Sequence, residues 1–335
     1  MAAARRPDIW TLIERYGSLF TLLVLVAVVA FLSPDFRKPE NPLNILRQYS
    51  FVGIVAVGMT YVIILGGIDL SVGSMVALLG GAGIMLLNTL ADHEVPTWLM
   101  LCAAAATMIG GGVVLGVLNG TAITAGRIAP FIVTLGTMAI FRSVVLAAAD
   151  GSEIRSMVPA FGEIASRGVD LPIHSSRGSP LELTLPMVAF ITVAAVGQFV
   201  LSCTAFGRRV LAIGDNATAA RYAGVPLSRV TIAVYAISGL CCGIAALLNS
   251  SRLNSVASSS LGSMYELDAI AAVVIGGTRM RGGAGSVFGT VIGVLILGVV
   301  GNMLNMLDVS PHLQGLVKGL IIIAAVLVQR FGRPV

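Results

Sequence analysis

The chain has 335 residues, of which 56% are hydrophobic and 11% charged, and its mean hydropathy is +0.94. Soluble domains carry about 25% charged residues, so this composition excludes an ordinary soluble domain and predicts an all-α, polytopic integral membrane protein. The formal net charge of +5 comes mainly from arginine, because the only lysines are Lys38 and Lys318. The four cysteines all lie in apolar runs, and neither they nor the histidines have the spacing of a disulfide framework or a metal site.

Ten apolar segments are each predicted to form a membrane-spanning helix, because a span needs about 20 mostly apolar residues. In chain order they are 17–33, 46–66, 70–90, 98–118, 130–149, 183–203, 230–250, 265–278, 284–306 and 313–329. The segment 265–278 is short for a span. We predict that these helices form a single transmembrane domain over residues 1–335.

The distribution of basic residues predicts the orientation, because Lys and Arg favour cytoplasmic loops. With the N-terminus inside, twelve of the 21 Lys and Arg residues fall on the inner side, seven on the outer side and two within spans. Ten spans then place both termini and the loop at 206–229 in the cytoplasm, and the long loop at 150–182 outside. The long loop has two open interpretations, a packed lid or partner surface and a poorly ordered connector.

The stretch from Gly207 to Pro226 has the signals of a small helix outside the membrane. Asp215 or Asn216 can cap its start, because a short side-chain oxygen accepts from the free N–H groups of the first turn. Several alanines favour helix after that point. Gly224 can take the left-handed conformation at the helix end, and Pro226 stops propagation. Such a helix either docks a partner or is a capped linker on the lipid surface.

An acidic residue, Asp69, lies between the second and third apolar segments. It belongs to the run Gly66-Gly67-Ile68-Asp69-Leu70-Ser71-Val72-Gly73-Ser74. A charge inside a bilayer costs roughly 2.5–3.5 kcal/mol on insertion scales, so its presence needs a reason. One interpretation is a polar pathway lined by Asp69. The other is structural: the two glycines end one helix, and Asp69 caps the next with the help of Ser71. The two interpretations are compatible.

Glycines suggest a weak internal repeat. A shift of 210 residues aligns Gly66, Gly67, Gly73 and Gly83 with Gly276, Gly277, Gly283 and Gly293. Paired glycine-interrupted segments mark the binding site in repeat-built transporters. Chance is the other explanation, because the chain contains 39 glycines.

Other local patterns concern helix packing and polar contacts. Glycines at spacing four, at 112, 116 and 120 and again at 285, 289 and 293, predict close approach of helices. The run Ser263-Met264-Tyr265-Glu266 fits a capping box, and Glu266 and Asp268 would occupy the first turn of the helix that follows. Asn119, Thr134 and Asn249 are polar groups in or near spans, where they could contact a polar solute or bond across helices.

The main enzyme motifs are absent from the sequence. It has no nucleophile elbow, no HExxH zinc motif and no P-loop, because neither lysine precedes Ser or Thr. Few charges lie within the spans, which disfavours an ion-coupled carrier. The chain therefore reads as a pore with either passive flow or an external energy source.

Three motifs resemble those of one known family. Gly66–Ser74 resembles the signature of the ribose-type monosaccharide permeases, the membrane subunits of ABC importers. Tyr265–Thr278 resembles a later motif of that family, and Gly207–Gly224 is similar to its cytoplasmic coupling loop. The resemblance covers about 43–328.

Three residues depart from the family pattern. Arg279 and Arg281 stand where the family usually has smaller or less basic residues, and Asp215 replaces a common glycine. These departures concern the cytoplasmic contacts rather than the fold.

The resemblance implies ATP-driven import of a ribose-like or other pentose or hexose sugar across a bacterial inner membrane by alternating access. It implies a cytoplasmic ATP-binding subunit, a periplasmic or extracellular sugar-binding protein and a second permease copy, but no nucleic acid, cofactor or metal and no catalytic residue in this chain. Candidate ATPase-coupling residues are Arg208, Arg209, Asn216, Arg221 and Tyr222. Candidate pathway residues are Asp69, Ser71, Asn119, Thr134 and Asn249. The alternatives are a permease for branched-chain amino acids or nucleosides, and a stand-alone channel or facilitator.

Overall fold

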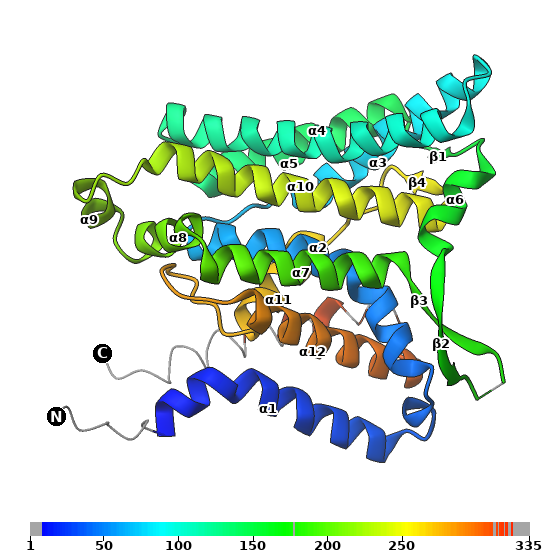
Figure 1. Cartoon of the computed structure of the whole chain (residues 1–335), viewed down its shortest axis with the longest axis horizontal. Coiled ribbons are helices and arrows are strands. Elements are labelled where there is room, and N and C mark those ends of the chain that lie inside the picture. The colour runs from blue at the N-terminus through cyan, green and yellow to red at the C-terminus, as the bar shows by residue number, and fades with distance from the viewer. Residues whose placement is uncertain are drawn as a thin grey trace.

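Long helices lying side by side form most of the molecule (Figure 1). The computed structural model describes residues 9–176, 178–310 and scattered positions from 313 to 323. The long helices are α1 (Ile9–Leu32), α2 (Asn41–Ile64), α3 (Val72–Asp92), α4 (Thr97–Gly126), α5 (Pro130–Ala148), α7 (Leu185–Cys203), α10 (Leu227–Leu253) and α12 (Val287–Met306).

All of these helices except α1 are long and apolar enough to cross a membrane, which makes seven among the described residues. Gly17–Leu32, within α1, is a shorter apolar helix. This finding confirms a helical, polytopic membrane protein. The count of ten spans is not confirmed, and the location of the termini stays a prediction. Most of the last predicted span, 313–329, lies outside the described residues.

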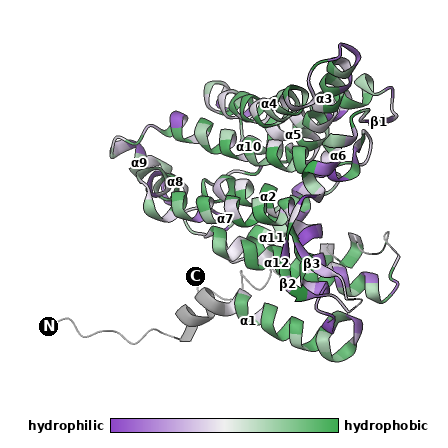
Figure 2. Cartoon of the chain, turned by 45° about the vertical axis from the view of Figure 1, so that its right-hand side comes forward, coloured by the Kyte–Doolittle hydropathy of each residue, from purple (hydrophilic) through white to green (hydrophobic). Residues whose placement is uncertain are grey.

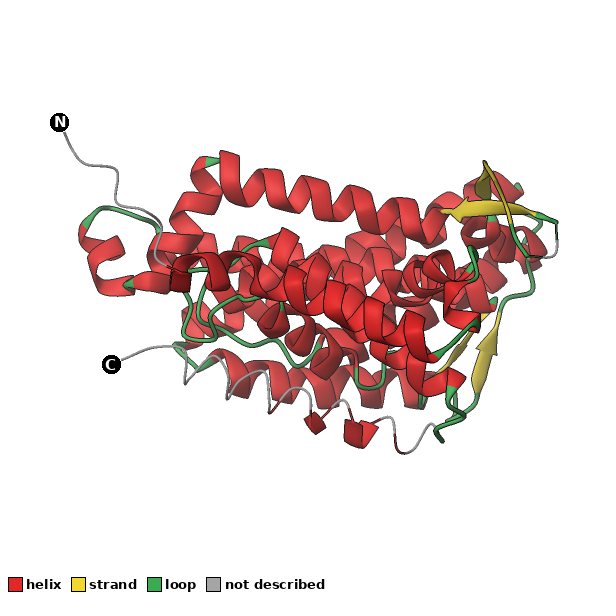
Figure 3. Ribbon diagram, turned by 90° about the horizontal axis from the view of Figure 1, so that it is seen from below, coloured by secondary structure: helices red, strands yellow, loops and turns green. Residues whose placement is uncertain are grey.

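Short elements gather at the two ends of the helix bundle (Figures 1 and 3). At one end, here called the α8–α9 end, lie the helices α8 (Ala205–Asp215) and α9 (Ala217–Tyr222). The other end, the strand end, carries the 3-10 helix η1 (Asp35–Arg37), the helix α6 (Pro159–Ser166) and the strands β1 (Glu153–Arg155), β2 (Gly168–His174), β3 (Pro180–Thr184) and β4 (Ser255–Ala257). A short helix inside the bundle, α11 (Tyr265–Ile275), completes the set.

The strands form two antiparallel pairs, β1 with β4 and β2 with β3. The loop predicted at 150–182 therefore contains regular structure, and the expectation of a purely helical chain missed these four short strands. β1 and β4 are about a hundred residues apart in sequence, with Glu153 opposite Ala257. No local pattern could reveal that pairing.

The core of the bundle is built around α2, whose residues from Tyr49 to Ile64 are all buried. They are mostly apolar on every side, as expected for a helix enclosed by neighbours. In contrast, α5 has few buried residues and exposes Phe131, Ile132 and Ile140. Figure 2 shows hydrophobic residues along the long helices and hydrophilic ones mainly near the two ends of the bundle.

The two glycine series predicted to pack helices do so. A Cβ atom added at Gly112 of α4 would overlap the carbonyl oxygen of Gly239 in α10. One added at Gly293 of α12 would overlap the carbonyl oxygen of Ala272 in α11. Both helix pairs thus touch through their backbones, the close approach that small residues allow between membrane helices.

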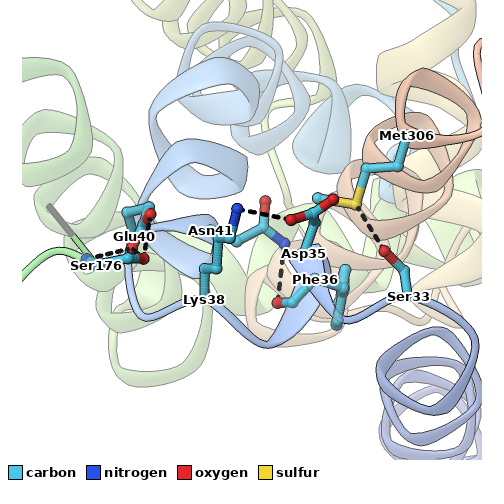
Figure 4. Close-up of polar contacts among 8 residues, drawn as sticks. All are labelled: Ser33, Asp35, Phe36, Lys38, Glu40, Asn41, Ser176 and Met306. Carbon is cyan, nitrogen blue, oxygen red and sulfur yellow. Dashed lines mark hydrogen bonds and ion pairs between the residues drawn. The ribbon is translucent and has the colours of Figure 1, made fainter.

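Polar contacts hold the start of α2 at the strand end (Figure 4). The Glu40 carboxylate accepts hydrogen bonds from the backbone N–H (3.2 Å) and the hydroxyl (2.6 Å) of Ser176, in the turn between β2 and β3. The bond from the Ser176 hydroxyl is the main cause that lowers the pKa of Glu40 below its usual value. Asn41 donates to the carbonyl oxygen of Phe36 at 3.3 Å and exchanges hydrogen bonds with Asn302 of α12. The β2–β3 turn is therefore tied to the bundle.

Candidate functional site

A glycine turn ends α2. Gly66 has a φ of +90°, and its N–H donates to the carbonyl oxygen of Ile63 at 2.9 Å. The N–H of Gly67 donates to the carbonyl oxygen of Val62, also at 2.9 Å. These two bonds around a left-handed glycine are a Schellman motif, which satisfies carbonyls left free at a helix end. The prediction that the glycines end one helix is confirmed. We call residues 65–71 the α2–α3 turn.

A turn with the same backbone pattern ends α11. Gly277 has a φ of +91°, its N–H donates to Val274 at 2.9 Å, and the N–H of Thr278 donates to Val273 at 3.2 Å. The structural equivalent of Gly66 is therefore Gly277, a shift of 211 residues. The predicted shift of 210, which pairs Gly66 with Gly276, is wrong by one residue. We call residues 276–286 the α11–α12 turn.

The two turns meet inside the protein. The N–H of Gly283, in the α11–α12 turn, donates to the carbonyl oxygen of Ile64, the last residue of α2, at 2.9 Å. A Cβ added at Gly282 would lie 2.9 Å from that same oxygen and 3.1 Å from the nitrogen of Gly66. Two segments more than 200 residues apart in sequence thus form one contact.

Asp69 organises the α2–α3 turn. Its Oδ1 accepts hydrogen bonds from the backbone N–H (3.0 Å) and the hydroxyl (2.7 Å) of Ser71, and its Oδ2 accepts from the hydroxyl of Ser238 in α10 (3.0 Å). Ser71 is the residue that precedes α3 and makes no side-chain cap bond to its first turn. The predicted capping role of Asp69 therefore takes another form, because Asp69 fixes the residue before the helix rather than the N–H groups inside it.

Two more predicted pathway residues reach the same turn. The Asn119 amide of α4 donates to the Ser71 hydroxyl at 2.9 Å, and the Thr134 hydroxyl of α5 donates to the carbonyl oxygen of Ile68 at 3.1 Å. Together with Asp69 and Ser238 these buried side chains form what we call the Asp69 cluster, defined as Asp69, Ser71, Asn119, Thr134 and Ser238. The structure thus brings four of the five predicted residues together.

The fifth predicted residue, Asn249, lies elsewhere. Its amide donates to the hydroxyl of Tyr265, the first residue of α11, at 2.8 Å. Sequence reasoning also missed Ser238, because a serine within an apolar run carries no distinguishing signal. Two buried polar atoms near the cluster, Asn119 Oδ1 and the Tyr235 hydroxyl, have no hydrogen-bond partner among the described residues.

The side chains of the Asp69 cluster form a hydrogen-bonded support around the α2–α3 turn. The Asp69 carboxyl group is engaged by three donors, and hydroxyl and amide groups supply the rest. Within the described residues, no group of three or more His, Cys, Asp or Glu side chains could hold a metal ion. The cluster joins α4, α5 and α10 to a segment of irregular backbone, which membrane proteins keep for positions buried in protein or lining a polar path.

A second irregular segment, 258–264, precedes α11. Arg142 of α5, which is half-buried, donates to the carbonyl oxygens of Ser258 (2.8 Å) and Leu261 (3.0 Å). The predicted capping box is wrong: the residue before α11 is Met264, with a φ of +68° and no side-chain cap bond. Glu266 does lie in the first turn, as expected.

The predicted span at 265–278 is also wrong as a full span. The helix α11 has 11 residues. At 1.5 Å per residue it is about 16 Å long, roughly half of the hydrocarbon core of a bilayer.

At the α8–α9 end, the predicted small helix is α9, and a second helix that was not predicted, α8, precedes it. α8 begins directly after Thr204, whose hydroxyl accepts from the N–H of Gly207 at 3.2 Å. Asn216 caps α9, because its Oδ1 accepts from the N–H of Ala219 at 2.9 Å. Gly224 follows with a φ of +77°. The cap by Asn216 and the left-handed Gly224 are therefore confirmed, whereas the other possible cap, Asp215, is the last residue of α8.

The candidate coupling residues all lie on the surface of these two helices. Arg208 and Arg209 of α8 and Arg221 of α9 are exposed, as is the capping residue Asn216, and the side chain of Tyr222 is 89% exposed. The opposite faces are buried through Val210, Ile213 and Ala220. Both helices thus hold an apolar face against the bundle and present polar side chains outward.

A bundle of membrane-length helices, interrupted by two glycine turns that contact each other and carrying two short helices at one end, defines a polytopic membrane protein. The family described as "Branched-chain amino acid transport system / permease component" matches residues 41–326. The ribose import permease protein of Bacillus subtilis is 40% identical over 95% of this chain and 93% of its own length. The ribose import permease protein of Haemophilus influenzae is 38% identical over 94% of this chain and 92% of its own length. The L-arabinose ABC transporter permease protein of Azospirillum brasilense is 34% identical over 99% of this chain and 92% of its own length. The chain therefore belongs to the ribose-type monosaccharide permeases within this family. No solved structure matches it.

Proposed function

We propose that this chain is the membrane-spanning subunit of an ATP-driven importer that carries a monosaccharide into a bacterial cell across its inner membrane. The observation that supports this most is its 38–40% identity, over more than nine-tenths of its length, to ribose import permeases. Relatives named for L-arabinose, D-allose and xylose also match at 33–34% identity. A monosaccharide substrate is therefore better supported than any single sugar.

The charges at the two ends support the orientation in which the α8–α9 end faces the cytoplasm. Exposed arginines gather there, namely Arg127, Arg208, Arg209, Arg221, Arg229, Arg279 and Arg281. The strand end carries most of the described acids, among them Glu94, Asp150, Glu163, Asp170 and Glu182. Basic residues accumulate on the cytoplasmic side of membrane proteins, which favours this placement.

The surface of α8 and α9 suits docking of a separate ATP-binding subunit. This chain has no P-loop, so the energy of ATP hydrolysis has to come from a partner. Arg208, Arg209, Arg221 and Tyr222 are accessible for that contact, and Asn216 holds the start of α9. In this proposal, closure of the ATPase moves both helices, and two permease copies alternate between outward-open and inward-open states. A sugar-binding protein would deliver the substrate at the strand end, where the loop at 150–182 lies.

A proline scan of α9 tests the docking. Ala220→Pro removes the N–H that bonds to the carbonyl oxygen of Asn216 at 2.9 Å and should break α9. We expect loss of sugar uptake and of ATPase co-purification, with normal membrane insertion. Ala217→Pro is the matched control, because proline is tolerated at the first position of a helix.

The outcomes separate the candidate functions. Wild-type uptake by Ala220→Pro would contradict the docking assignment. Uptake by the native protein that continues after ATP depletion would replace the importer with a facilitator. Transport of a branched-chain amino acid or a nucleoside in place of a sugar would move the chain to a related type of permease.

A further inference from the structure

The last turn of α8 touches the end of α2 and the α11–α12 turn mainly through backbone atoms. A Cβ added at Gly214 would overlap the carbonyl oxygen of Ile64 and would lie 2.5 Å from the nitrogen of Gly283. One added at Gly283 would lie 2.7 Å from the Cα of Asp215. The residues Ile64–Gly66, Gly214–Asp215 and Gly282–Gly283 therefore meet mainly through their backbones, and we call this contact the glycine junction.

Three of the four glycines in the junction, Gly214, Gly282 and Gly283, are needed for different reasons. Gly282 and Gly283 have φ values of +86° and +77°, which other residues adopt only with strain. Gly214 lies within the regular helix α8, so its conformation suits any residue. What excludes a side chain at Gly214 is the backbone of α2 and of the α11–α12 turn. The local sequence of α8 does not require glycine, but the contact does.

The junction has the Asp69 cluster on one side and the candidate coupling helices on the other. Ile64 ends α2 five residues before Asp69, which is bonded to Ser71 and Ser238. The other end of α8 is fixed on α7, because a Cβ at Gly207 would overlap the carbonyl oxygen of Leu201. A displacement of α8 must therefore move the α2–α3 turn or separate the packed backbones, and close-packed interiors transmit strain rather than compress.

We propose that the glycine junction is the joint through which movement of α8 and α9 reaches the translocation machinery, with Gly214 as its positioning residue. The inference rests on the proposed function, in which α8 and α9 receive the ATPase. Through α2, movement at the junction would displace the α2–α3 turn and then, through the Asp69 cluster, the helices α4, α5 and α10. Through Gly282 and Gly283, the same movement would reach α11 and α12.

Gly214→Ala in the reconstituted complex, with its ATP-binding subunit and sugar-binding protein, tests the joint. We expect basal ATPase activity to stay near wild type, while sugar uptake and the stimulation of ATPase by the loaded binding protein fall about tenfold, because an overlapping Cβ forces the backbones apart. Gly136→Ala is the matched control, since its Cβ would meet nothing within 4 Å. Wild-type uptake by Gly214→Ala would overturn the proposal.

A cross-link keeps the proposal testable if Gly214→Ala does not assemble. In a background with Cys102 and Cys203 replaced by serine, Asp215→Cys and Arg281→Cys place thiols on the two exposed sides of the junction. Joining them with a short bifunctional reagent should leave uptake unchanged, because the joint moves as one body. Loss of uptake on cross-linking would mean that α8 slides over the turn, and the joint would be rejected.

The two proposals can fail separately. If Ala220→Pro keeps uptake while Gly214→Ala loses it, the docking assignment fails and the junction remains a positioning element. If Gly214→Ala keeps uptake, the junction fails whatever the α9 variants do.

Discussion

The α2–α3 turn and the α11–α12 turn start from the same backbone and are attached to the protein in different ways. Both open with a Schellman motif around a left-handed glycine, Gly66 or Gly277. Three residues later the first turn has Asp69, which is buried and bonded to two serines, whereas the second has Met280, whose side chain is 40% exposed. A helix ending is thus set by glycine and peptide groups, and the side chains that follow decide which neighbours the turn holds.

The second turn is closed mainly on itself. The N–H of Arg279 donates to the carbonyl oxygen of Ala284 and the N–H of Gly282 to that of Arg279, both at 3.0 Å. Its attachment to α2 is the backbone bond from Gly283 to Ile64. We therefore expect substitutions that remove side-chain contacts to lower the free energy of unfolding much more in the first turn than in the second. Substitutions that strain the backbone should lower it equally in both turns.

The largest difference is expected from Asp69→Leu. This change leaves the N–H and hydroxyl of Ser71 and the hydroxyl of Ser238 without their acceptor, and buried unsatisfied groups cost about 1–3 kcal/mol each. The free energy of unfolding in mixed micelles should fall by about 3 kcal/mol or more. Met280→Leu, at the equivalent position, should change it by less than about 0.5 kcal/mol. Equal effects of the two changes would break the comparison.

Alanine at the two left-handed glycines should cost the same in both turns. A Cβ at Gly66 would have its nearest atom 3.9 Å away, and one at Gly277 would have none within 4 Å, so only the backbone conformation is penalised. Gly66→Ala and Gly277→Ala should each lower the free energy of unfolding by about 1–2 kcal/mol. If the losses of unfolding free energy caused by Gly66→Ala and Gly277→Ala differed by more than about 2 kcal/mol, the two turns would not be equivalent.

The smallest changes in the free energy of unfolding are expected on replacing two buried threonines, and the two changes should have opposite signs. Thr134 donates to Ile68 in the first turn, so Thr134→Val should lower the free energy of unfolding by about 1 kcal/mol. In the second turn, the buried hydroxyl of Thr278 has no hydrogen-bond partner among the described residues, so Thr278→Val should leave stability unchanged or raise it by up to about 1 kcal/mol. Thermal unfolding of both variants shows whether each substitution lowers or raises stability. Destabilisation by Thr278→Val would indicate that the Thr278 hydroxyl has a hydrogen-bond partner.

Much of the molecule could be predicted because its signals are local. Long apolar runs mark the helices, Gly66 marks a helix end, and Asn216 and Gly224 mark the limits of α9. The polar residues of the Asp69 cluster stood out because charged and amide groups are rare in these apolar segments. The exception, Ser238, resembles any other serine in a transmembrane helix.

The errors concern features that depend on distant partners or on conformation. The pairing of β1 with β4 joins segments about a hundred residues apart. The alignment of the two turns was displaced by one residue because Gly276 and Gly277 are identical in sequence, and only the positive φ of Gly277 distinguishes them. α11 was predicted too long because apolar composition continues past its end, while the turn at Gly277 is set by backbone bonds.

The contact of Arg142 with the segment before α11 joins a residue that is synthesised early to a segment that is synthesised later. The carbonyl oxygens of Ser258 and Leu261 belong to turns rather than to a helix, and because both residues are buried these oxygens need partners within the protein. Arg142 precedes Ser258 by 116 residues, so α5 is synthesised well before this segment. The growing chain thus supplies the donor of these two hydrogen bonds first and the segment that needs them later.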